Sequence, residues 1–237
     1  MLRFLFCYNA RVVRQVGYLV VIVAVIAFAA HMGFQPSRAG SPVVFLWMGV
    51  PTVALAIAGC VRAWKDGVLR DWFRIRSGDF TRGFIGAALL FGGSFAFSKT
   101  LKLPQVLWVA RLYDQLGDPA VLRKNVSVVV AGIVILSIAE EIVWRGLVMS
   151  LLEEKVGSRR AWIVSALLYA LAHVPTLWAL ADINAGPNPV LVLAALGAGL
   201  VWGFMARRFE RLVPGMFSHV LFNWTVIMMF RLWGPSV

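Results

Sequence analysis

SIAEEIVWRG, residues 137–146, places two carboxylates and a guanidinium inside an otherwise apolar run, 126–152. A helix of this length can cross a bilayer, because each residue adds about 1.5 Å and the hydrocarbon core is about 30 Å thick. An ionised group near the bilayer centre costs at least about 2.5 kcal/mol on insertion scales. Glu140, Glu141 and Arg145 therefore need partners, a water-filled cavity or both, and they mark a candidate functional site.

The composition is that of a polytopic membrane protein. Of the 237 residues, 60% are hydrophobic and 14% are charged, whereas about a quarter are charged in soluble domains. The formal net charge is +12, but the basic residues stand in short segments between apolar spans. That distribution suits cytoplasmic loops and lipid headgroups, so we expect the lipid bilayer as a partner and no nucleic acid. Cys7 and Cys60 form no cluster typical of a disulfide framework or a structural zinc site.

Apolar runs predict an all-α, polytopic transmembrane helix bundle that forms a single integral membrane domain, 1–237. About seven or eight membrane helices are expected, with one or two interfacial amphipathic helices. The clear spans are 16–32, 43–61, 83–98, 126–152, 161–177, 190–206 and 214–233. The basic segment 62–82 and the segment 104–116 carry apolar residues at helical spacing, which predicts helices that lie in the interface.

The distribution of lysine and arginine predicts a cytoplasmic N-terminus. With that orientation the cytoplasmic segments carry 15 basic residues and the outer segments carry seven. Five of these seven lie in 99–125, the one segment that disagrees with the topology. We expect the protein in the cell (inner) membrane.

Three helices each present a polar pair at helical spacing. Glu141 and Arg145 are four residues apart with the acid first, which favours an intrahelical ion pair. Glu140 points about 100° away from Glu141 and stays free for another partner. The other two pairs lie in later spans and are Tyr169/His173 and His219/Asn223.

These groups suit the activation of water. A desolvated carboxylate can act as a general base, a histidine can orient the same water, and a histidine with an amide can donate to an oxyanion. No Gly-x-Ser-x-Gly or His-Glu-x-x-His motif is present. The residue types alone leave zinc open as a cofactor.

The three motifs together resemble those of the CPBP family. These are the type II CAAX prenyl endopeptidases and the bacteriocin-processing or Abi-type membrane proteins. The matching motifs are Glu-Glu-x-x-x-Arg (140–145), aromatic-x-x-x-His (169–173) and His-x-x-x-Asn (219–223), each on its own span and in the family's order. The resemblance covers 126–233 as the core, and 1–125 carries no recognisable motif. Tyr169 stands where the family usually has phenylalanine.

The resemblance implies a glutamate-type intramembrane endopeptidase that cleaves a membrane-attached protein or peptide, CAAX-like or lipid-anchored, near its C-terminus. By it, Glu140 is the base that activates water, and His173 shares that water. His219 and Asn223 form the oxyanion hole, and Glu141, Arg145 and Tyr169 support the site. A metal-free mechanism and a cavity open to the cytosol are also implied.

Two other functions stay open at this point. Members of the same family act as non-catalytic membrane immunity or regulatory partner proteins. A transporter that uses Glu140 as a proton carrier is a further alternative, although no internal repeat supports it.

Overall fold

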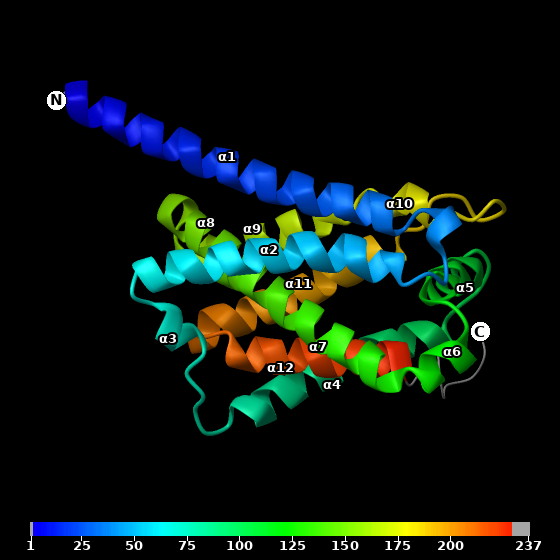
Figure 1. Ribbon diagram of the computed structural model, residues 1–237. Coiled ribbons are helices and arrows are strands. Elements are labelled where there is room, and N and C mark those ends of the chain that lie inside the picture. Colours follow the sequence, from blue (N-terminus) through cyan, green and yellow to red (C-terminus); the bar gives the residue numbers. More distant parts are fainter. Residues whose placement is uncertain (1, 229–237) are drawn as a thin grey trace.

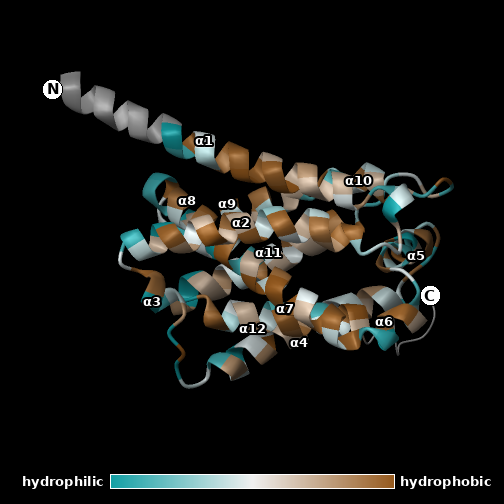
Figure 2. Ribbon diagram, in the orientation of Figure 1, coloured by the Kyte–Doolittle hydropathy of each residue, from teal (hydrophilic) through white to brown (hydrophobic). Residues whose placement is uncertain are grey.

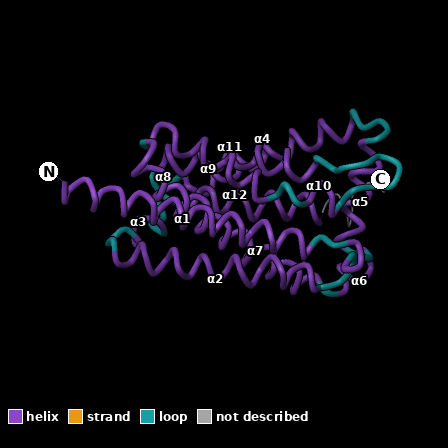
Figure 3. The backbone as a smooth tube through the Cα atoms, turned by 90° about the horizontal axis from the view of Figure 1, so that it is seen from above, coloured by secondary structure: helices purple, strands orange, loops and turns teal. Residues whose placement is uncertain are grey.

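The computed structural model describes residues 2–228, with side chains from residue 14 onward, and these residues are helical apart from loops and turns. The long helices run lengthwise beside one another, and the loops gather at two ends of the bundle (Figures 1 and 3). In chain order the elements are α1 (Leu2–Gly33), η1 (Pro36–Arg38), α2 (Val43–Lys65), α3 (Leu69–Trp72), α4 (Asp79–Lys99), α5 (Gln105–Leu116), α6 (Pro119–Lys124), α7 (Val126–Glu141), η2 (Ile142–Val148), α8 (Met149–Val156), α9 (Ser158–Ala172), α10 (Thr176–Ala179), α11 (Val190–Phe209) and α12 (Val213–Trp224).

Six stretches of helix in the described residues are long and apolar enough to cross a membrane. They are Arg14–Gly33, Val43–Lys65, Asp79–Lys99, Val126–Val156, Ser158–Ala179 and Val190–Phe209, and a shorter apolar helix covers Val213–Met228. Hydrophobic residues follow the long helices, and hydrophilic residues collect toward their ends (Figure 2). The all-α polytopic fold is therefore confirmed. The predicted last span, 214–233, is helical as far as residue 228, and 229–233 lie outside the described residues.

The prediction of one interfacial helix over 62–82 is wrong. Helix α2 runs on to Lys65, and only the four residues of α3 are helical before α4 begins at Asp79. Gly67 and Gly78 adopt φ angles of 76° and 83°, a left-handed conformation that glycine takes at little steric cost. Gly67 follows the end of α2, and Gly78 directly precedes α4. The segment 104–116 does form a helix, α5.

Buried ionic contacts fix the start of α4. Asp79 is fully buried, and its carboxylate accepts hydrogen bonds from the guanidinium of Arg211 and from the backbone N–H of Arg76. Hydrogen bonding to Asp79 raises the pKa of the Arg211 guanidinium above its ordinary value, so Arg211 stays charged. This ion pair ties α4 to the turn between α11 and α12.

Small residues bring the later helices into close contact. A Cβ on Gly199 of α11 would lie 3.2 Å from Ala166 of α9, and a Cβ on Gly83 of α4 would lie 2.8 Å from the carbonyl oxygen of Pro214 in α12. At these two positions the neighbouring helix leaves room for the hydrogen of glycine but not for a larger side chain. On α11 the small residues Ala195, Ala198 and Gly199 are buried.

The helix that carries the three charged residues is continuous over Val126–Val156, but its middle is not regular. The segment η2 (Ile142–Val148) is π-helical, and all seven of its residues are buried. Short π-helical segments inside α-helices are rare and are frequent at functional sites. The apolar pattern of the sequence does not distinguish this turn from an ordinary α-helix.

Candidate active site

Glu141 and Arg145 form the ion pair expected from their spacing. The Arg145 Nη1 donates to the Glu141 Oε1 at 3.0 Å, and each side chain is 1% exposed. The guanidinium also lies 4.9 Å from the ring centre of Tyr169 and 5.2 Å from that of Trp202. Its Nη2 donates to the carbonyl of Gly199 at 3.4 Å. A buried cation is thus met by a carboxylate, a carbonyl and two aromatic faces.

Glu140 is not bound by Arg145 and finds its partners on other helices. The hydroxyl of Tyr169 on α9 donates to the Glu140 Oε2 at 2.7 Å. The His219 Nε2 on α12 lies 3.6 Å from the same oxygen. Glu140 is 8% exposed, so its carboxylate stands in a largely water-free position against two polar groups.

His219 joins the two glutamates. Its Nδ1 is 3.0 Å from the Glu141 Oε1, and because a carboxylate oxygen only accepts, Nδ1 carries the proton of this hydrogen bond. The imidazole stacks on Trp202 with ring centres 3.7 Å apart and planes at 19°. Trp202 is fixed in turn, since its Nε1 donates to the hydroxyl of Ser218 at 3.1 Å. The ring is therefore held with Nε2 toward Glu140.

His173 ends α9, where the sequence predicted that the helix would continue to residue 177. Pro175 explains the break, because a proline disfavours helical geometry in the preceding residue. The Nδ1 of His173 donates to the carbonyl of Tyr169 at 2.8 Å, which leaves Nε2 without a hydrogen-bond partner in the described part of the chain. Among the same residues no hydrogen bond joins Glu140 directly to His173.

Asn223 lies on α12, one turn after His219. It contacts the continuous helix Val126–Val156, which we call the central helix. Its Nδ2 donates to the hydroxyl of Ser137 at 3.0 Å, three residues before Glu140. One amide hydrogen of Asn223 is left for another acceptor. The seven residues singled out from the sequence thus come together from α7, η2, the end of α9 and α12, and Ser137 of α7 and Trp202 of α11 join them.

A zinc centre needs several protein ligands directed at one point. Within the described residues no group of three or more histidine, cysteine, aspartate or glutamate side chains is arranged to hold a metal ion. The imidazole Nδ1 atoms of His173 and His219 are engaged with a carbonyl and a carboxylate.

Comparison with known proteins identifies the segment that carries this geometry. No curated protein and no solved structure matches the chain. Residues 122–225 match the family model described as Type II CAAX prenyl endopeptidase Rce1-like. This segment holds the central helix, α9, α11 and all of α12. The match supports the resemblance found in the sequence: residues 122–225 are similar to the Rce1-like type II CAAX prenyl endopeptidases.

Proposed function

We propose that this integral membrane protein is an endopeptidase that cleaves a membrane-attached protein or peptide, CAAX-like or lipid-anchored, near its C-terminus. The observation that carries the proposal is that the two glutamates have different partners. Glu141 is held by Arg145, whereas Glu140 is buried, free of the guanidinium and bonded to Tyr169. A positioned carboxylate of this kind is suited to general-base work.

The proposed reaction uses a water molecule between Glu140 and the Nε2 of His173. Glu140 takes a proton from this water while the water oxygen bonds to the carbonyl carbon of the substrate. The tetrahedral intermediate then loses the amine, which receives the proton from Glu140, and a carboxylic acid remains. The bond that breaks is the peptide C–N bond, so atoms and protons balance.

His219 and Asn223 are proposed as the donors to the oxyanion. The free amide hydrogen of Asn223 is available for this purpose. Since Nδ1 of His219 already donates to Glu141, its Nε2 can donate only when the ring carries both protons. Glu141 and Arg145 support this arrangement by fixing the histidine, and no step requires a metal.

The proposed orientation places the N-terminus in the cytoplasm of a cell (inner) membrane and opens the site toward the cytosol. The surplus of arginine and lysine at one end of the bundle supports this orientation. The family's printed description supports a CAAX-like tail as the substrate.

Mass spectrometry of membrane proteins tests the activity and identifies the substrate in one experiment. Membranes from cells with the wild-type chain are compared with those carrying Glu140→Gln, and Glu154→Gln serves as the matched control. Glu154 lies on α8 in the same membrane helix and forms a partly exposed pair with Arg62. We expect an uncut precursor with Glu140→Gln only. A phenotype that persists without any precursor would favour the non-catalytic partner role instead.

A chelator separates the metal-free mechanism from a zinc-dependent one. Incubation of the purified protein with EDTA or 1,10-phenanthroline should leave its cleavage rate unchanged, because no proposed step uses a metal. Loss of activity that zinc restores would contradict this mechanism.

A further inference from the structure

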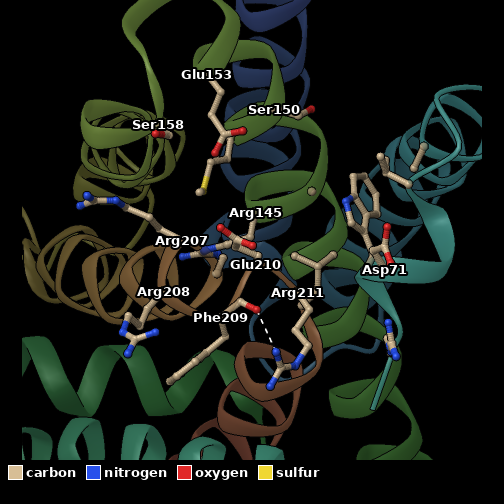
Figure 4. A pocket seen from close by; sticks show the side chains of 18 of the residues that line it. Asp71, Arg145, Ser150, Glu153, Ser158, Arg207, Arg208, Phe209, Glu210 and Arg211 are labelled. Carbon is tan, nitrogen blue, oxygen red and sulfur yellow. Dashed lines mark hydrogen bonds between the residues drawn. The ribbon is translucent and has the colours of Figure 1, made fainter. Parts of the chain in front are cut away.

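A large cavity lies beside the central helix, at the end of the bundle where α2, α8 and α11 meet (Figure 4). Its volume is about 950 Å³. The walls are the segment between α2 and α4, the inner face of η2 and α8, and the last turn of α11 with the turn that follows. Arg145 lines the cavity and Glu140 does not, so this space is separate from the carboxylate proposed as the base.

The cavity is rich in guanidinium groups. Seven arginines line it, and three of them, Arg62, Arg145 and Arg211, have carboxylate partners. The other four form no ion pair in the part of the chain described. They are Arg74 and Arg76 from the α3–α4 segment and Arg207 and Arg208 from the end of α11.

Carboxylates are present in smaller number. Asp66 is paired with Arg62, and three others, Asp71, Glu153 and Glu210, line the cavity without an ion pair among the described residues. Figure 4 shows Arg207 and Arg208 on α11 and Asp71 on the segment across the cavity. The four unpaired guanidinium groups outnumber the three unpaired carboxylates, so the unpaired groups carry a net positive charge.

Exposed apolar side chains lie beside the arginines of the cavity. Ile75, between Arg74 and Arg76, is 65% exposed. Phe204, which lines the cavity one turn before Arg208, is 50% exposed. Arginines that alternate with exposed apolar residues at the ends of membrane helices suit a molecule with a charged head and hydrocarbon chains.

We propose that this cavity binds the phosphate headgroup of an anionic phospholipid. The planar guanidinium group matches phosphate oxygens in pairs, and basic pockets between membrane helices are suited to such headgroups. The acyl chains would run along the outside of α11 past Phe204. The binding rests on residues outside the proposed catalytic set, so it can be tested without any proteolytic assay.

The test uses the full-length protein, delipidated in detergent, and native mass spectrometry of bound lipid. Dioleoylphosphatidylglycerol is compared with dioleoylphosphatidylcholine, whose headgroup carries the same phosphate but no net charge. The wild-type protein should retain phosphatidylglycerol in preference to phosphatidylcholine. In Arg207→Gln/Arg208→Gln the affinity for phosphatidylglycerol should fall roughly thirtyfold. Each arginine near an anionic lipid increases the affinity about fivefold, and the two effects multiply.

Arg159→Gln/Arg160→Gln is the matched control. These two exposed arginines begin α9 at the same end of the bundle and do not line the cavity. The control removes the same charge and should keep wild-type affinity. Arg74→Gln/Arg76→Gln, on a segment outside the membrane helices, provides a second variant if the α11 variant does not fold, and the same loss is expected.

Three results would overturn the proposal. The first is equal retention of the two lipids by the wild-type protein. The second is an equal loss of affinity in the cavity variants and the Arg159/Arg160 control. The third is displacement of phosphatidylglycerol by millimolar inorganic phosphate or by a peptide with a free C-terminal carboxylate, which would assign the cavity to a free anion or to the substrate.

Discussion

At the scale of single residues, the Tyr169 hydroxyl is the contact with the clearest chemical consequence. It donates to the carboxylate that we propose as the base, and the usual phenylalanine of the family would have no such group. Tyr169→Phe should lower kcat roughly ten- to hundredfold with little change in KM, because a hydrogen bond to a charged group contributes about 1.5–3 kcal/mol. Steady-state cleavage of the accumulated precursor measures both constants.

Tyr113→Phe is the control for that measurement. Tyr113 is also buried, and its hydroxyl donates to the carbonyl of Val226 at 3.0 Å, away from the two glutamates. The same loss of kcat in both variants would mean that Tyr169 acts through stability alone. The ring contacts of Tyr169 with Trp144 and His173 remain in the phenylalanine variant, so the fold should persist.

The buried pair of Glu141 and Arg145 makes a prediction about stability. Arg145→Met leaves Glu141 buried without its cation, which should cost about 3–5 kcal/mol. Arg62→Met breaks a partly exposed pair and should cost less than about 1 kcal/mol. Thermal unfolding in detergent compares them, and Arg145→Met/Glu141→Gln should regain part of the loss. A double variant no more stable than Arg145→Met would show that the pair does not matter.

At the scale of helices, the close approach of α4 to α12 positions two of the proposed catalytic residues. A Cβ on Gly83 would lie 2.8 Å from the Pro214 carbonyl oxygen and 2.7 Å from the Phe217 ring. Gly83→Ala should therefore displace α12, destabilise the protein by about 1–3 kcal/mol and reduce cleavage.

Gly92→Ala, on the same helix, is its control. No heavy atom lies within 4 Å of a Cβ at Gly92, and alanine is the better helix former by about 1 kcal/mol. The melting temperature should stay the same or rise. Equal destabilisation by both substitutions would mean that packing against α12 is not the cause.

The helices also show which features the sequence could predict. The ion pair of Glu141 and Arg145 follows from spacing within one helix, and the apolar runs locate every long span. The contacts of Glu140 with Tyr169 and of His219 with Glu141 depend on how three helices rotate and slide against one another. Residue periodicity within each helix contains no information on that relation.

Local backbone irregularities were missed for a different reason. The π-helical turn η2 and the end of α9 at His173 lie inside apolar runs whose composition does not change. Segment 62–82 kept a helical spacing of apolar residues, but Gly67 and Gly78 decide its backbone. Only the glycines and Pro175 were available as signals for these breaks.

At the scale of the whole molecule, the proposed orientation can be tested by labelling. In a background with Cys7→Ser and Cys60→Ser, a membrane-impermeant maleimide should label Ile183→Cys in intact cells. Ile183 is 97% exposed in the loop after α10. Arg159→Cys, exposed at the opposite end of α9, should be labelled only after permeabilisation. The reverse pattern would place the arginine-rich end outside the cell.

The central claim is that Glu140 activates the attacking water. The purified protein in phosphatidylglycerol/phosphatidylcholine vesicles is mixed with the precursor that accumulates in membranes, and the rate of peptide-bond cleavage is measured by mass spectrometry. Glu140→Gln should cleave roughly a hundred to ten thousand times more slowly than wild type, the range expected for loss of a general base, and Glu154→Gln should match the wild-type rate. A wild-type rate from a correctly folded Glu140→Gln protein would contradict the account.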